Sequence, residues 1–308
     1  MSIATPVVFL FGPTAVGKTD VLTRLAGLPI EVISADSMQV YRGMDIGTAK
    51  PDPALREALA HHLIDILDPH ERFDVGRFVD LADSCIAAIT ARGRIPVVSG
   101  GTGYYFRHLL FGLPRTPQVE PAVRERLQHD LETEGLAALR SRLERVDPAS
   151  AARIDPADPY RTVRALEIFE QTGTPRSAFR VPAEPRRDLA TTVIELYRER
   201  EAVRERIAER VAAMFGAGLR REVESLVDSG VAAGDPGMRA IGYREFFRDD
   251  GSLSTADGDT QIQTRIVTAT RRYAKRQVTF FSGLPGRIAV HADDGDRVAR
   301  LVRDAVRP

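Results

Sequence analysis

The chain has 308 residues, 43% of them hydrophobic, and its 43 Lys and Arg residues balance its 43 Asp and Glu residues. Zero net charge argues against a histone-like nucleic-acid binder, and a single cysteine, Cys85, excludes an internal disulfide framework and a cysteine-based zinc site. No apolar stretch reaches the ~18–20 residues that span a membrane, and the N-terminus lacks a signal-peptide pattern, so we expect a cytoplasmic protein of one domain plus an insertion, or of two domains.

Residues 7–19 predict a strand, a phosphate-binding turn and the start of a helix. The apolar run Val7–Phe11 leads into Gly12-Pro-Thr-Ala-Val-Gly-Lys-Thr, which matches the pattern G-x-x-x-x-G-K-[ST]. Glycines let backbone N–H groups approach phosphate oxygens, and the positive end of the following helix points at the same anion. Lys18 adds a charge, and the Thr19 hydroxyl suits a Mg²⁺ ion. The pattern predicts a phosphate or diphosphate site without identifying the compound.

A second predicted strand, residues 31–35, ends at Asp36. A carboxylate at this place can help hold Mg²⁺, can act as a general base, or can simply cap the next segment. Residues 36–50 show no helical or strand period and carry two glycines, which indicates a functional loop. A helix over 53–61 and a short strand over 62–67 are expected to follow.

The next predicted elements are an amphipathic helix over 75–92 and a buried strand over 95–99. This strand ends in Ser-Gly-Gly-Thr-Gly, without the aspartate that holds the metal in ordinary nucleotide hydrolases, which argues against a standard ATPase or GTPase. The glycines around Thr102 form either a second anion-binding turn or a plain tight turn. The alternation of strands and helices predicts an α/β fold with a parallel sheet flanked by helices on both faces. Loops 12–19, 36–50 and 100–105 should therefore meet at its carboxyl edge.

Residues 115–185 read as an all-helical insertion between two parts of a catalytic core, 1–114 and 186–308. Helices are expected in the insertion over 121–134, 136–146 and 159–172. The core should resume with a strand over 191–196. After it we expect a helical run over 199–227 that is broken near Gly216 and Gly218, a helix over 260–281, a strand over 287–290 and a terminal helix.

Basic residues gather in the second half of the core. Arg206 and Arg210 lie four positions apart on one helix, so one of them could reach a diphosphate, although a solvated charged face would explain both. Loop 238–244 and helix 260–281 are Arg-rich and interleaved with Tyr243 and Tyr273, residue types suited to phosphate backbones and stacked bases. Only three lysines occur, which marks these positions as candidates for functional sites: Lys18, Lys50 and Lys275.

Several of these segments resemble the signature motifs of the tRNA dimethylallyltransferases, also called isopentenyl-tRNA transferases. The resembling stretches are 12–19, 34–51, 100–106, 158–167, 239–244 and 274–277. They follow one another across almost the whole chain, and the stretch 34–51 is the most specific. The resemblance departs from the family at Tyr104, where leucine is commoner. The zinc finger of many eukaryotic members is missing, so a bacterial-type member is expected.

The resemblance implies transfer of the dimethylallyl group of dimethylallyl diphosphate to N6 of the adenine just 3′ of a tRNA anticodon, with release of diphosphate. It also implies a P-loop NTPase-like core that binds the diphosphate of the prenyl donor with Mg²⁺. Asp36 would take the proton of the amine, Thr102 would bind the donor or steady the acceptor, and Arg210 would support the departing diphosphate. We expect a monomer that binds the anticodon stem-loop through its helical insertion.

The remaining site residues are carried over from the same motifs. The predicted diphosphate-binding residues are Gly12, Thr14, Ala15, Val16, Gly17, Lys18 and Thr19, with Thr19 also a metal ligand. The predicted tRNA-binding residues are Asp36, Ser37, Met38, Gln39, Tyr160, Arg161, Thr162, Val163, Arg164, Arg239, Ala240, Ile241, Gly242, Tyr243 and Arg244.

Three other functions stay open at this stage. An adenylate isopentenyltransferase would share the phosphate loop and Asp36 but would modify a free nucleotide, and the insertion and basic segments favour a large RNA instead. A small-molecule kinase would bind and consume ATP. A non-catalytic RNA-binding protein would explain the basic segments but not the phosphate loop.

Overall fold

The computed structural model describes residues 4–114, 116, 119–254 and 257–305. The chain folds as two compact units, a core unit of Met1–Leu110 with Arg186–Pro308 and an insertion unit of Phe111–Pro185. The units divide the chain at residue 110, where the sequence suggested 114, and at residue 185.

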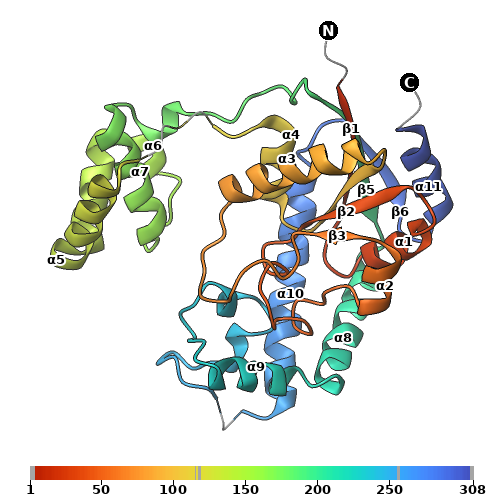
Figure 1. The fold of residues 1–308 in the computed structure, drawn as a ribbon. Helices are drawn as coiled ribbons and strands as arrows, with labels where there is room; N and C mark the ends of the chain where they lie inside the picture. Colours follow the sequence, from red (N-terminus) through yellow and green to blue (C-terminus); the bar gives the residue numbers. More distant parts are fainter. Residues whose placement is uncertain (1–3, 115, 117–118, 255–256, 306–308) are drawn as a thin grey trace. The chain divides into compact units, whose positions relative to one another are not determined.

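The core unit is built on one parallel sheet with the strand order β3-β2-β4-β1-β5-β6 (Figure 1). The strands are β1 (Thr5–Phe11), β2 (Ile30–Ala35), β3 (His61–His62), β4 (Ile95–Gly100), β5 (Leu189–Tyr197) and β6 (Arg287–His291). Gly100 at the end of β4 pairs with both Phe11 and Ala35, the last residues of its two neighbours. The segments that start at Gly12, Asp36 and Gly101 therefore leave the sheet side by side, as predicted.

Helices cover both faces of this sheet. The helices of the core unit are α1 (Lys18–Leu25), α2 (Pro53–Ala58), α3 (Val75–Ala91), α4 (Gly103–Phe111), α8 (Arg200–Gly216), α9 (Leu219–Asp228), α10 (Asp259–Phe281) and α11 (Gly295–Asp304), of which α9 packs on loop 36–50 and not on the sheet. Because side chains alternate along a strand, Val8 and Leu10 of β1 pack into the cluster that contains residues of α1 and α11. Phe9 and Phe11 point the other way and contact Phe106 of α4, and Phe11 stacks on Phe281 of α10 at 4.5 Å.

The insertion unit has a small apolar core of its own. Its helices are α5 (Pro121–Val146), α6 (Pro148–Ala151) and α7 (Pro159–Thr172). Gly135 interrupts α5 with a positive φ of 81°, so the two separate helices predicted for this stretch are confirmed as the two halves of α5. Leu127, Leu139 and Leu143 pack against Leu166 of α7. Ion pairs such as Arg124 with Glu167 and Arg142 with Glu170 add to this helix–helix packing.

Two predicted elements are wrong in detail. Of the expected strand 62–67, only His62 belongs to strand β3, because Leu63 and Asp65 have positive φ angles of 63° and 57°, which a strand does not accommodate. The helix expected over 53–61 ends at Ala58, where Leu59 turns to an extended conformation. The predicted basic loop 238–244 contains short 3₁₀ turns at Gly237–Arg239 and Arg244–Phe246.

The long loop 36–50 has no helix or strand, as predicted, yet it is tightly held. The Glu222 carboxylate of α9 accepts the backbone N–H groups of residues 45, 46 and 47 at 2.8–3.1 Å. It also accepts the hydroxyl of Tyr243 at 2.5 Å, and that hydroxyl accepts the N–H of Gly47 at 3.1 Å. At the other end of the loop, the buried ammonium of Lys50 donates to the Tyr41 carbonyl at 2.6 Å.

The expected role of Tyr243 in stacking on bases is wrong. Its side chain is fully buried, and its ring packs so closely on Gly47 that a Cβ there would lie 2.4 Å from it. Its hydroxyl is used inside the protein by Glu222 and Gly47. Tyr243 therefore supports loop 36–50 from beneath and offers no face to a ligand.

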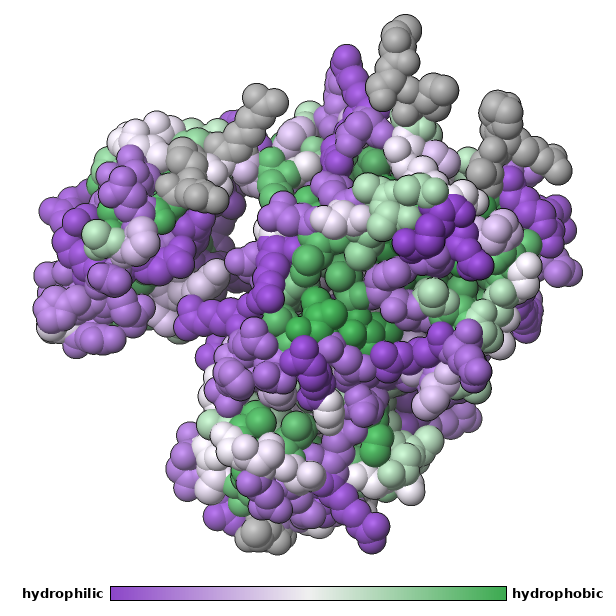
Figure 2. Space-filling model, viewed as in Figure 1, coloured by the Kyte–Doolittle hydropathy of each residue, from purple (hydrophilic) through white to green (hydrophobic). Residues whose placement is uncertain are grey.

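The face of the core unit seen in Figure 2 carries an apolar patch at its centre, with polar residues around it. Apolar surface with a polar rim is typical of an interaction site.

Replacing Glu222 should loosen loop 36–50. Glu222→Ala leaves three backbone N–H groups and a buried tyrosine hydroxyl without their acceptor, so we expect it to lower the free energy of unfolding by about 1–3 kcal/mol in urea titrations. Glu224→Ala, at an exposed position of the same helix, is the matched control and should stay close to the parent. Equal stability of the two variants would contradict the proposed support.

Candidate active site

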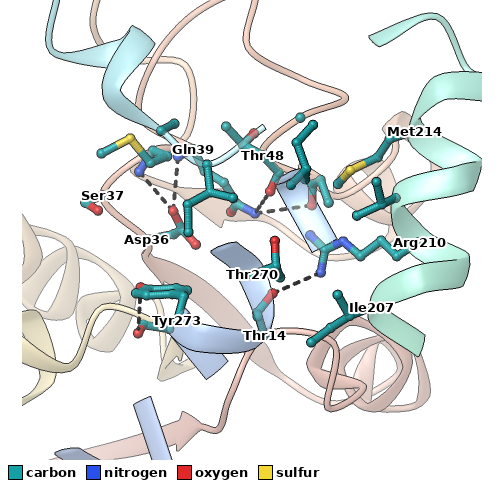
Figure 3. Close-up of a pocket in the computed structure, with 18 of the residues that line it drawn as sticks. Thr14, Asp36, Ser37, Gln39, Thr48, Ile207, Arg210, Met214, Thr270 and Tyr273 are labelled. Atoms are coloured by element: carbon teal, nitrogen blue, oxygen red, sulfur yellow. Dashed lines mark hydrogen bonds between the residues drawn. The ribbon is translucent and has the colours of Figure 1, made fainter. Parts of the chain in front are cut away.

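The three predicted loops meet in one cavity of about 340 Å³ at the carboxyl edge of the sheet (Figure 3). Its walls come from the phosphate loop 12–19, loop 36–50, Gly101, helices α8 and α10, and residues 239–244. Figure 3 shows Asp36, Thr14 and Arg210 projecting into it from three different elements. The convergence predicted from the strand order is confirmed.

Cationic side chains hold the carbonyl groups of the phosphate loop. The Lys18 ammonium donates to the carbonyls of Gly12 and Pro13 at 2.9 and 3.0 Å. Arg206 donates to the Ala15 carbonyl at 3.0 Å, and Arg198 to the Val16 carbonyl at 3.2 Å. Helix α1 begins directly after Gly17, whose φ of 112° suits glycine. The first N–H groups of α1 have no intrahelical acceptor, so this turn suits an anion.

Two partly buried cations face this anion site. Burial and the nearby Arg210 lower the pKa of Lys18 to about 7, while Asp36 opposes the shift. Burial also lowers the pKa of Arg210, and Asp36 again opposes it. Arg210 lines the cavity and donates to the Thr14 hydroxyl at 3.4 Å, whereas Arg206 is occupied by Ala15 and Asp20. An anion in the cavity would compensate both cations.

Asp36 uses one carboxylate oxygen for the backbone. Its Oδ1 accepts the N–H groups of Met38 and Gln39 at 2.9 and 3.4 Å (Figure 3). Both bonds go to Oδ1, so capping of the next segment, one of the three predicted uses, occupies a single oxygen. Because Asp36 lines the cavity, Oδ2 remains for a ligand or a proton.

Close packing explains the glycines around Thr102. A Cβ at Gly100 would lie 2.3 Å from the Ala35 carbonyl oxygen, and one at Gly103 would lie 2.4 Å from the ring of Phe280. These contacts favour the tight turn over a second anion-binding turn. The Thr102 hydroxyl accepts the N–H of Ser37 at 3.0 Å, next to Asp36. The observed role of Thr102 is thus to hold loop 36–50 in place.

The predicted RNA-contacting stretches differ in how much side chain they expose. In the core unit, Arg239 and Arg244 are exposed and line the cavity with Ala240 and Ile241. In the insertion unit, 62% of Tyr160 is exposed and Arg161 is exposed as well. Thr162 and Val163 are buried in α7, and Arg164 pairs with Glu167 at 2.7 Å. Tyr160 and Arg161 therefore present most of the side-chain surface of this stretch.

The three lysines do not share one role. Lys18 lies in the phosphate loop, and Lys50 is buried and holds loop 36–50 through Tyr41, Asp45 and Asp65. Lys275 is exposed on α10 and does not line the cavity. The prediction that the few lysines mark functional sites is therefore supported at Lys18. At Lys50 the structure shows only a supporting role for loop 36–50.

Comparison with known proteins places the chain in a family. The family model described as IPP transferase matches residues 39–283. A tRNA dimethylallyltransferase of Thiobacillus denitrificans is 45% identical over 96% of both chains. The chain belongs to the tRNA dimethylallyltransferase family. Its curated relatives are prenyl-transferring enzymes that act on tRNA, and 43% identity extends over 97% of the chain to the Thioalkalivibrio sulfidiphilus enzyme.

Solved structures of the family share the fold. The tRNA isopentenylpyrophosphate transferase of Bacillus halodurans matches with a TM-score of 0.68 and 35% identity over 98% of both chains. A eukaryotic dimethylallyltransferase acting on tRNA matches with a TM-score of 0.78 and 28% identity over 94% of this chain and 75% of that one. The P-loop NTPase-like sheet predicted for this tRNA dimethylallyltransferase family member is confirmed.

Sequence reasoning missed the contacts that join distant parts of this family member. Glu222 had no assigned role, and Arg198 was one of many arginines in its stretch. Gln277 lay inside a recognised motif, but its contact with the phosphate loop was not foreseen.

Among the described residues, no helix is long and apolar enough to cross a membrane.

Binding of an anion should change the protonation of Lys18. Its pKa of about 7 in the free protein means that the ammonium loses its proton above neutrality, and a bound diphosphate favours the charged form. Pyrophosphate binding should therefore take up a proton, and affinity should fall as pH rises above 7. Calorimetry in buffers of different ionisation enthalpy measures this uptake.

Lys18→Arg is the matched variant for this measurement, because a guanidinium stays charged. The titration of pyrophosphate itself is common to both proteins, so the difference in proton uptake reports on Lys18. The same uptake in parent and variant would show that Lys18 is already charged in the free protein.

Proposed function

We propose that this chain transfers the dimethylallyl group of dimethylallyl diphosphate to N6 of the adenine 3′-adjacent to the anticodon of tRNAs, releasing diphosphate. The observation that carries the proposal is one cavity lined both by the cationic phosphate loop and by Asp36. An anionic leaving group and a base beside an incoming amine are what this reaction requires. Membership of the family supports the choice of substrates.

In the proposed reaction the N6 lone pair forms a bond to C1 of the donor while the C1–O bond breaks and its electrons leave on the diphosphate. C1 is allylic, so positive charge can develop there. Lys18, Arg210 and the N–H groups at the start of α1 would stabilise the departing diphosphate. The free Oδ2 of Asp36 would take the proton lost by N6. Atoms and charge then balance without water or an oxidant.

We also propose that Mg²⁺ accompanies the diphosphate. The Thr19 hydroxyl and the Asp36 carboxylate line the same cavity, and both are oxygen ligands of the kind that Mg²⁺ prefers. Among the described residues, no three acidic, histidine or cysteine side chains cluster as a complete metal cage. That pattern fits an ion held by one or two side chains and completed by phosphate oxygens and water. When bound, the ion would neutralise charge on the diphosphate.

The acceptor would reach the cavity as a base turned out of the anticodon stack. Leaving the stack costs a few kcal/mol, which contacts to the opened loop offset. Arg239 and Arg244 line the cavity and can meet the RNA backbone near the reacting base. Tyr160 and Arg161 are the exposed groups that the insertion unit would offer to the anticodon stem-loop.

A transfer assay tests the function directly. The protein is mixed with unmodified tRNA, dimethylallyl diphosphate and Mg²⁺, and the digested RNA is analysed by mass spectrometry for a prenylated adenosine. A parallel reaction contains AMP in place of tRNA. We expect product from tRNA alone. Product from AMP would support a free-nucleotide enzyme, and ATP consumption without product would support a kinase.

Removing the proposed base should separate binding from chemistry. Asp36→Asn keeps an acceptor for the Met38 N–H group but cannot take a proton, so we expect kcat to fall by about 10²–10⁴-fold. The Kd for tRNA should stay within about threefold, measured by filter binding. Asp52→Asn, at another capping aspartate that does not line the cavity, is the control. Full turnover by Asp36→Asn would remove Asp36 from the proposed role.

Charge reversal at the cavity rim tests the RNA surface. The double substitution Arg239→Glu and Arg244→Glu should weaken tRNA binding and make its dependence on salt less steep, because fewer counterions are released. Affinity measured at several salt concentrations gives the slope. Arg303→Glu on α11, exposed and outside the cavity, is the control. Parallel salt slopes for parent and double variant would place the RNA elsewhere.

A further inference from the structure

One side chain on α10 joins the phosphate loop to the turn that follows β4. Gln277 is only 4% exposed. Its Oε1 accepts the N–H of Thr14 at 2.8 Å, and its Nε2 donates to the carbonyl of Gly101 at 2.7 Å. A side-chain amide offers an acceptor and a donor together, so Gln277 satisfies both buried backbone groups at once.

The connection continues from Gly101 to the loop that bears Asp36. Thr102 follows Gly101, its N–H donates to the Ala35 carbonyl at 3.1 Å, and its hydroxyl accepts the Ser37 N–H at 3.0 Å. Ala35 and Ser37 flank Asp36 in the chain. Hydrogen bonds of 2.7–3.1 Å, together with the peptide link from Gly101 to Thr102, therefore connect the proposed donor site, through Gln277, to the proposed base.

Gln277 lies against Gly101 at a distance that only glycine permits in this arrangement. A Cβ at Gly101 would lie 2.4 Å from Nε2 of Gln277. The Tyr273 hydroxyl donates to the same Gly101 carbonyl at 3.3 Å, from the turn of α10 before Gln277. Tyr273 and Arg276 also line the cavity. Helix α10 therefore lines the cavity through Tyr273 and Arg276 and also positions the phosphate loop through Gln277.

We propose that Gln277 is a positioning residue: it fixes the phosphate loop against the Thr102 turn and so sets the distance between the reacting carbon of the donor and the amine beside Asp36. This inference rests on the proposed function. Gln277 takes the Thr14 N–H for the protein and leaves the N–H groups at the start of α1 and the cations for the diphosphate. Its loss should consequently affect the geometry of the reaction more than the affinity for the anion.

Two single variants and their combination test the proposal. Gln277→Ala removes both bonds, and Gly101→Ala displaces the amide by its added Cβ. Each should lower kcat by about 10–100-fold at saturating substrates, because small displacements of reacting atoms have large effects on rate. The Kd for pyrophosphate should change by less than about threefold. The double variant should be no slower than Gln277→Ala, since the clash that Gly101→Ala creates is then absent.

Two further variants make the comparison specific. Gln277→Glu keeps the acceptor for Thr14 but cannot donate to Gly101, so we expect a similar loss in kcat. Gln261→Ala, at an exposed position near the start of the same helix, should behave as the parent. Unchanged kcat in Gln277→Ala and Gly101→Ala would overturn the proposal, and so would losses that multiply in the double variant.

A measurement without catalysis separates this inference from the proposed function. Hydrogen exchange should show the Thr14 amide protected in the parent and exchanging faster in Gln277→Ala. Faster exchange in the variant, combined with no prenylated tRNA from the parent, would refute the proposed function but support the link that Gln277 makes between Thr14 and Gly101. Unchanged exchange would refute the link through Gln277 even if the parent modifies tRNA.

Discussion

The cavity depends on the pairing of Gly100 with Phe11 on one side and Ala35 on the other. This pairing makes three parallel strands end level, so the phosphate loop, Asp36 and the Thr102 turn begin from one row of backbone hydrogen bonds. A side chain at Gly100 would meet the Ala35 carbonyl oxygen at 2.3 Å and force the strands apart. The sheet therefore fixes where the three segments begin, and Gln277 then holds the phosphate loop against the Thr102 turn.

Electrostatics explains why such a site favours an anion. Lys18 and Arg210 are partly buried and repel each other, and the pKa of each is lowered chiefly because the charged form is poorly solvated there. The loop carbonyls are already occupied by Lys18, Arg198 and Arg206, which leaves the N–H side of the loop for a ligand. The proposed diphosphate would satisfy these N–H groups and compensate the cations, and that charge balance would also suit diphosphate as a leaving group.

The parts that carry the chemistry are loops, but they are held from outside the site. Glu222 binds three consecutive N–H groups of loop 36–50, and Tyr243 fills the space beneath Gly47. Lys50 anchors the far end of the same loop. Each contact orders a segment that lacks secondary structure, so the loop presents Asp36 without the entropic cost of ordering it on binding.

The sequence alone determined what is local in this protein. Strand, turn and helix of the phosphate loop are contiguous in the chain, so their pattern can be recognised directly, and Gly135 breaks α5 where the residue itself predicts a break. The parallel sheet followed from the alternation of elements. The phosphate loop and the break in α5 depend on neighbours within a few residues, and the sheet on the order of elements that such local patterns reveal.

Only the tertiary structure decided which distant residues meet. Gln277 reaches Thr14 across 263 positions and Glu222 reaches Gly47 across 175, and such contacts leave no periodicity in the chain. The sequence favours Tyr243 for stacking on bases, yet its side chain is buried, because composition does not distinguish a buried tyrosine from an exposed one. Burial and partners arise only when segments pack together, so the motifs indicated the candidate site, and the fold determined which side chains hold it in place.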